Sequence, residues 1–145
     1  MPAWPSSVIS VVHQAPSDTG YDLRSIKCSI RGVPFGQLKP RGAPTGPPAW
    51  SDAVRAQTGH LPKVLGPCIL RVTFLLPPDK FPTDCPYGND LDNLLKRFCD
   101  AIKQTVLSDA PGTDSAIIAL EATKTRVDTP AQAGAELEII ELPLG

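Results

Sequence analysis

The chain has 145 residues, of which 41% are hydrophobic, and a formal net charge of −1 at pH 7. This length favours one compact domain, and the apolar runs are far too short to span a bilayer, which argues against a membrane protein. The N-terminus resembles neither a secretory signal nor an arginine-rich presequence, so we expect a cytosolic protein. The four cysteines are widely spaced, which argues against a zinc module or a redox pair.

Charge is distributed unevenly along the chain. Residues 1–80 hold nine Lys/Arg and four Asp/Glu, whereas residues 81–145 hold five Lys/Arg and eleven Asp/Glu. Most of these charges are explained by ordinary solvated surfaces. The distribution also fits a basic half that binds a polyanion and an acidic half that binds metal.

The first half of the chain predicts a peripheral segment followed by a folded domain. Residues 1–22 are the peripheral segment, and residues 23–145 are the domain. A short apolar run over 8–12 fits either an added edge strand or a loose tail. Periodicity and turn residues then predict a strand over 25–33, a Pro/Gly-rich loop over 36–48, a helix over 49–60 with Ser51 as its N-cap, and a strand over 67–76.

The second half carries the clearest helical signal. A loop over 77–89 leads into residues 91–107, where apolar residues recur at helical spacing and predict a helix with one buried face. A turn over 108–113 and two strands, over 115–127 and 135–142, complete the chain. We therefore expect an α+β domain with a mixed sheet of about four strands packed against two helices.

Acidic residues lie at the start of this helix and before the strand that follows it. Asp90 and Asp92 open the helix, Lys96 follows one turn after Asp92, and Asp114 precedes the strand. Each acid alone is explained by capping or turn formation. Together, three carboxylates need a cation among them, and oxygen ligands suit Mg²⁺ or Mn²⁺. A lysine beside such a cluster indicates metal-assisted phosphodiester chemistry, although a surface pair with Asp92 also explains it.

The sequence resembles a known family at these positions. The run 90–96 reads Asp-Leu-Asp-Asn-Leu-Leu-Lys, Asp100-Ala101-Ile102 follows on the same helix, and Asp114 precedes a strand that reaches Lys124. This pattern resembles the RusA family of Holliday-junction resolvases, and residues 25–142 follow the family's order of elements. The resemblance implies a small homodimeric, Mg²⁺-dependent endonuclease that nicks four-way DNA junctions symmetrically during recombination and repair.

The resemblance also implies roles for individual residues. Asp90, Asp92 and Asp114 would bind the metal, and Lys96 would be an essential active-site lysine. Asp109 competes with Asp114 for the third ligand position, and the spacing to the following strand favours Asp114. Candidates for contacts with the DNA backbone, each of which is also explained as a surface charge, are Lys39, Arg41, Arg55, Lys103, Lys124 and Arg126.

Three other functions stay open at this point. A nuclease for other branched DNA, such as flaps or forks, needs the same residues. A non-catalytic protein that binds DNA junctions needs the fold without turnover. A metal-stabilised structural domain that does not bind DNA fits the low net charge.

Overall fold

The computed structural model describes residues 10–15, 23–35, 47–80 and 90–142, and it describes only the backbone of residues 10–15, 23, 47 and 48. Five β-strands, two α-helices and two short 3-10 helices form within these ranges. The strands and α-helices are β1 (Ser10–Ala15), β2 (Leu23–Arg31), α1 (Pro47–Thr58), β3 (Cys68–Leu76), α2 (Leu91–Ile102), β4 (Ile117–Arg126) and β5 (Gly134–Glu141); the 3-10 helices are Thr113–Ala116 and Pro130–Gln132.

All five strands belong to one mixed sheet in the order β1-β2-β5-β3-β4. Strands β3 and β4 are parallel, and the other neighbouring pairs are antiparallel. Parallel neighbours need a crossover connection, and α2 lies in the connection from β3 to β4. The predicted α+β class with a mixed sheet and two helices is therefore confirmed. The sheet has one strand more than expected, because residues 10–15 form the added edge strand β1.

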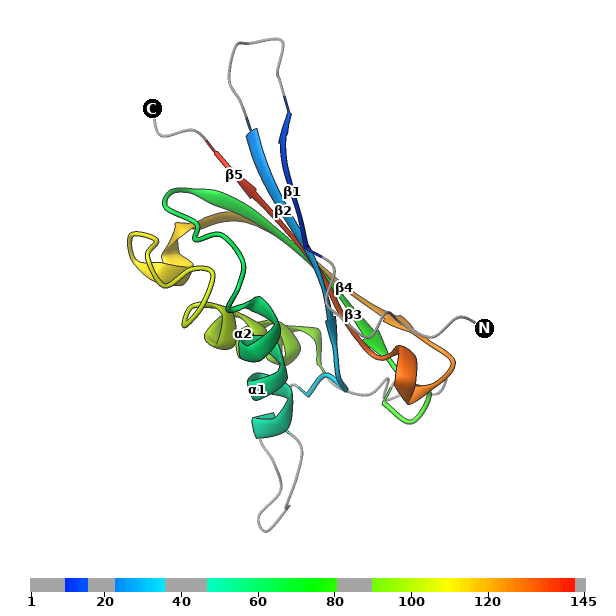
Figure 1. Cartoon of the computed structure of the whole chain (residues 1–145). Helices are drawn as coiled ribbons and strands as arrows, with labels where there is room; N and C mark the ends of the chain where they lie inside the picture. The colour runs from blue at the N-terminus through cyan, green and yellow to red at the C-terminus, as the bar shows by residue number, and fades with distance from the viewer. Residues whose placement is uncertain (1–9, 16–22, 36–46, 81–89, 143–145) are drawn as a thin grey trace.

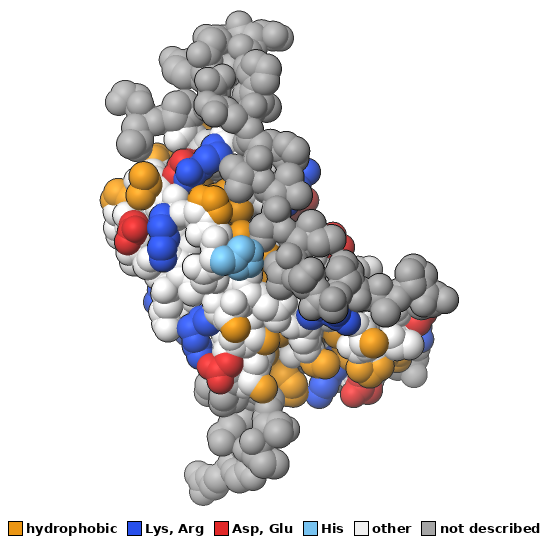
Figure 2. Space-filling model, in the orientation of Figure 1, with side chains coloured by type: hydrophobic (Ala, Val, Ile, Leu, Met, Phe, Trp, Pro, Cys, Tyr) orange, Lys and Arg blue, Asp and Glu red, His pale blue; other side chains and the backbone are white. Residues whose placement is uncertain are grey.

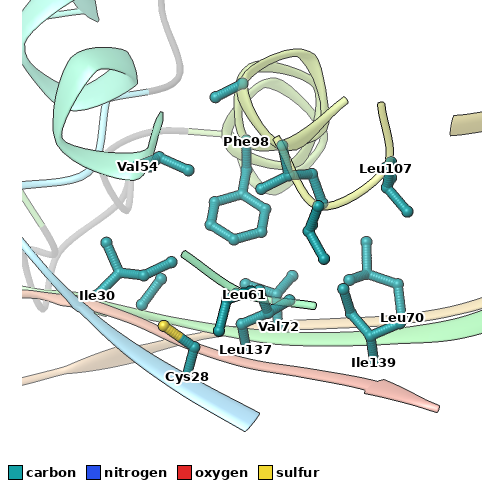
Figure 3. Close-up of a cluster of buried hydrophobic side chains, with 14 of the residues drawn as sticks. Cys28, Ile30, Val54, Leu61, Leu70, Val72, Phe98, Leu107, Leu137 and Ile139 are labelled. Carbon is teal, nitrogen blue, oxygen red and sulfur yellow. The ribbon is translucent and has the colours of Figure 1, made fainter. Parts of the chain in front are cut away.

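Both helices cover the same face of the sheet (Figure 1). Residues of β3 alternate between this face and the opposite one, so that Leu70, Val72 and Phe74 are buried while Arg71 is exposed. Phe98 of α2 points from the helix toward the sheet (Figure 3), and its ring meets that of Phe74 edge to face at a centroid distance of 5.7 Å. This core fixes α2, and with it the acids at its first turn, against the sheet.

The opposite face of the sheet is polar. Arg71 contacts Glu138 and Glu121, at 3.4 and 3.6 Å, and Lys27 lies 3.8 Å from Glu138. Cross-strand pairs of opposite charge stabilise a solvated sheet face modestly. A sheet with one packed face and one polar face matches the alternation in the sequence.

Helix α2 ends earlier than its apolar periodicity predicts. The helix stops at Ile102 rather than at residue 107, although Val106 and Leu107 are fully buried. The carbonyl of Val106 accepts a hydrogen bond from the Val64 amide at 2.9 Å, and the Thr105 carbonyl accepts one from Lys63 Nζ at 2.6 Å. These long-range bonds hold the segment as turns, so its apolar residues enter the core without helical geometry.

Helix α1 begins earlier than expected. It starts at Pro47, and proline suits the first turn of a helix because its missing N–H has no partner there. The prediction of Ser51 as the N-cap is therefore wrong, and Ser51 lies buried inside the helix. Among the described residues, no helix is long and apolar enough to cross a lipid bilayer.

The buried contact of Phe98 gives a prediction for stability. Phe98→Ala should lower the free energy of unfolding by about 3–5 kcal/mol, because the substitution leaves a cavity beneath α2. Leu65 is 54% exposed, so Leu65→Ala serves as a control with little effect. Urea denaturation followed by circular dichroism measures both. Equal midpoints for the two variants would contradict the burial of Phe98.

Candidate active site

The first turn of α2 presents two carboxylates to solvent. Asp90 is the N-cap residue, with φ −65° and ψ 137°, yet its side chain makes no capping hydrogen bond. Asp92 is exposed, and its Oδ1 accepts a hydrogen bond from the Asn93 amide at 2.9 Å. The positive end of the helix dipole favours both anions here. Capping therefore does not use the carboxylate of Asp90, and an oxygen of each acid can face a ligand.

A shallow depression lies between this turn and β4. The acids Asp90 and Asp92 border it on the helix side, and Lys124 borders it from β4. Its apolar wall comes from Leu91, Leu95 and Ala122. Two carboxylates and one ammonium group thus surround a single open site, in which the carboxylates are suited to a hard cation and the lysine to an anion.

Lys96 lies one turn beyond Asp92 on the exposed side of α2 and does not line this depression. The only charged pair formed within the described part of α2 and its C-cap joins Asp100 to Lys103, with 3.2 Å between Nζ and Oδ1. Lys96 therefore makes no ion pair with Asp92, although the spacing allows one. Its ammonium group stays near the acidic turn and exposed.

Asp114 occupies a different place. It lies in the 3-10 helix Thr113–Ala116, after Gly112 and Thr113, which both have positive φ (71° and 51°). It borders a second depression, together with Cys99 of α2 and residues 117–120 of β4. Cys99 comes nine residues after Asp90, about 13 Å further along the helix axis. Asp114 is therefore beside the last turns of α2, at the opposite end from Asp90.

The expected group of three carboxylates is not assembled within the described part of one chain. No three His, Cys, Asp or Glu side chains among residues 24–35, 49–80 and 90–142 come close enough together to hold a metal ion. The physical reason is the direction of α2, whose N-terminal end adjoins Ala122 and Lys124 while its C-terminal end adjoins Ile117. Helix and strand run antiparallel, so acids before each of them lie at opposite ends of the layer.

The charge of Asp114 acts on two groups near the C-terminal end of α2. Burial, and then the charges of Asp114 and Asp100, raise the pKa of the Cys99 thiol from 9.0 to about 11. The pKa of Lys103 is also raised, first by its hydrogen bond to Asp100, then by the charges of Asp100 and Asp114. Asp109 lies exposed in the preceding turn and borders neither depression. Of these two acids, only Asp114 borders a depression.

This arrangement predicts how Cys99 reacts. Its thiol should be alkylated slowly at pH 8, because a raised pKa leaves little thiolate. Asp114→Asn should increase the rate, since removing a nearby negative charge lowers the thiol pKa, whereas Asp109→Asn should not. Peptide-resolved mass spectrometry after iodoacetamide treatment over a pH series measures this. Identical rates in both variants would place Asp114 away from Cys99.

The proposed DNA contacts occupy several elements. Lys124 lies at the first depression, and Arg126 is exposed two residues later at the end of β4. Arg55 forms an ion pair with Asp52 on α1, and Lys103 forms one with Asp100. Lys39 and Arg41 lie outside the described residues. On the face in Figure 2, basic and acidic side chains are interspersed. The described candidates lie on α1, at the C-cap of α2 and on β4, so these four do not form one basic surface.

The sequence did not reveal that Lys124 lies beside Asp90 and Asp92. A parallel β3–α2–β4 unit brings the end of β4 to the start of α2. Knowledge of this topology would have been needed to predict the position of Lys124. No protein-family model matches the chain, and no curated protein matches it.

Proposed function

We propose that this protein is a Mg²⁺-dependent endonuclease of the cytoplasm that cuts branched DNA in recombination and repair, with a four-way junction as its substrate. The observation that carries the proposal is the open site formed by Asp90, Asp92 and Lys124 at the start of α2. The resemblance of residues 90–96, Asp100-Ala101-Ile102 and Asp114 to the RusA family supports the same reaction and substrate.

The residues at this site fit a hard divalent cation. Carboxylate oxygens are the ligands that Mg²⁺ takes, Mn²⁺ is a substitute, and open access leaves positions for water and a phosphate. Asp90 and Asp92 would hold the ion. The resemblance also implies Asp114 as a third ligand, which within one chain lies at the other end of α2. An ion held there would supply Lewis-acid chemistry, which polarises a phosphate and lowers the pKa of water.

The lysines supply the positive charge that the reaction needs. Lys124 borders the carboxylates, so it would hold a phosphate of the backbone beside them. Lys96, one turn along α2, would stabilise the negative charge that develops on the phosphate during hydrolysis. Arg126, Arg55 and Lys103 would position neighbouring phosphates, which fixes the DNA without reading its sequence.

Paired cuts require two active sites. A four-way junction has two symmetry-related strands to cut, and each chain holds one pair of carboxylates at α2. A homodimer with two-fold symmetry is the commonest way to supply two such sites, so the proposal includes one.

The direct test uses a labelled four-way junction. Nicking should occur with Mg²⁺ or Mn²⁺ and disappear with EDTA, and paired symmetric products should exceed cuts in a linear duplex of the same sequence. Flap and fork substrates in parallel identify a nuclease for other branched DNA. Full cleavage in EDTA would overturn the metal mechanism.

The position of Asp114 favours one alternative, a non-catalytic protein that binds DNA junctions. Asp114 lies apart from Asp90 and Asp92 in one chain, and a pair of carboxylates alone is a weaker ligand set for Mg²⁺. Tight junction binding without nicking in any divalent metal would establish this alternative.

A further inference from the structure

Strand β4 forms an edge of the sheet and exposes apolar side chains. It pairs with β3 on one side, and no described strand pairs with its other side. Ile118 is 60% exposed and Leu120 is 50% exposed, whereas the residues that pair with Leu120 and Ala122 on β3, Leu70 and Val72, are buried. A long edge strand with exposed apolar residues is a template for pairing with another strand.

Helix α2 leaves this strand partly uncovered. Leu120, Ala122 and Lys124 share the helix side of the sheet, because they pair with residues of β3 that face the core. The two depressions at Asp90 and at Asp114 follow one another between α2 and β4. Leu91 and Leu95 add apolar surface along the same line, and both are only partly buried. The exposed apolar surface is therefore continuous from helix to strand.

The sequence of β4 is complementary to itself in the antiparallel direction. An acid, Asp114, precedes the strand; apolar residues occupy its first half; and its second half carries Lys124 and Arg126. Antiparallel association of two copies would place the acidic start of each strand beside the basic end of the other. Opposite charges across a strand pair stabilise it, and apolar residues meet at its centre.

The same reasoning restricts the register. Paired residues on two antiparallel strands point to the same face of the sheet. A two-fold axis perpendicular to the sheet therefore lies midway between one residue and the same residue of the second copy. An axis at Glu121 would set two carboxylates directly opposite each other, which is destabilising. An axis at Ala119 or Leu120 brings Ile118 and Leu120 against apolar residues of a second copy. Both of these registers place Asp114 beside the basic end of that copy.

We propose that two copies of this chain associate through the edges of their β4 strands, antiparallel and with the axis at Ala119 or Leu120. The result is a continuous sheet of two copies with the surface of Ile118 and Leu120 buried at its centre. This inference deepens the homodimer included in the proposed function by assigning its interface, and it is tested without a nuclease assay.

The first test measures mass by light scattering at micromolar concentration. The wild-type chain should have twice the 15.4 kDa of one chain. Leu120→Asp should shift it to a monomer, because it places two carboxylates near the axis. Leu65→Asp is the matched control, since Leu65 is 54% exposed but lies outside β4, and it should stay dimeric. A monomeric wild type, or a dimer that Leu120→Asp leaves intact, would overturn the proposal.

A charge-swap series tests the interface independently of Leu120. Asp114 faces Lys124 of the second copy when the axis lies at Ala119, and it faces Arg126 when the axis lies at Leu120. Asp114→Lys and the opposite change at its partner, Lys124→Asp or Arg126→Asp, should each weaken dimerisation about tenfold, because each change appears twice in a two-fold dimer. The double variant that combines Asp114→Lys with the change at its true partner should restore dimerisation, and which of the two double variants does so identifies the register. Within one chain, the part of β4 from Ile117 to Lys124 alone spans about 23 Å, so the restored contact must join two copies. If neither double variant associates more tightly than its single variants, the pairing is refuted.

Nicking separates this proposal from the nuclease. If Leu120→Asp disrupts the dimer but the wild-type protein cuts no DNA, the interface is supported and the proposed function is wrong. A monomer that nicks DNA removes the interface and keeps the metal mechanism.

Discussion

Asp92→Asn should lower the rate of junction nicking by at least about 100-fold while leaving junction affinity equal or tighter. The carboxylate of Asp92 is exposed at the first turn of α2 and borders the depression that Lys124 also borders. An amide keeps the shape but not the charge that holds a divalent cation. Removing a negative charge that faces DNA phosphates lowers the repulsion between protein and DNA. The variant should therefore lose cleavage without losing affinity for the junction.

The measurement combines single-turnover nicking in Mg²⁺ with fluorescence anisotropy on the same junction without metal. Glu136→Gln is the matched control, because Glu136 is an exposed carboxylate on the opposite face of the sheet, and it should nick at the wild-type rate. Wild-type nicking by Asp92→Asn would remove this residue from the metal site. Equal loss in Glu136→Gln would show that the effect is not specific to α2.

Asp114→Asn should also abolish nicking, whereas Asp109→Asn should leave it within a few-fold of the wild-type rate. The two acids flank the same turn, but Asp114 borders a depression with Cys99 and Asp109 is exposed away from both depressions. The amide substitution preserves size in both cases, so only the position of the charge differs. Single-turnover nicking of a four-way junction in Mg²⁺ measures both variants.

The opposite result has a specific meaning. If Asp109→Asn were inactive and Asp114→Asn active, the third ligand would come from the exposed turn. We expect both variants to unfold at the same temperature as the wild type, because neither carboxylate is fully buried. Equal unfolding temperatures would exclude loss of folding as the cause of inactivity.

The short-range features of this fold could be predicted from the sequence because they depend on local periodicity. The apolar spacing of Leu94 and Phe98 identified α2, and the alternation in residues 68–76 identified β3. Element ends were less accurate, since Val106 and Leu107 continue the apolar pattern while long-range hydrogen bonds from Lys63 and Val64 prevent further helix. Periodicity reports which residues are buried, and the backbone partners of a segment decide its geometry.

For the candidate site, the sequence by itself determined the chemistry of its parts: two acids at the first turn of a helix, a lysine one turn later, and an acid before a strand. Only the tertiary structure decided which of these meet. The parallel crossover from β3 to β4 makes α2 run antiparallel to β4, so Lys124 joins Asp90 and Asp92 while Asp114 joins Cys99. Strand β5 pairs between β2 and β3, which leaves β4 at the edge. The order of strands in the sheet results from pairing between segments that are distant in the sequence, and no local sequence pattern encodes it.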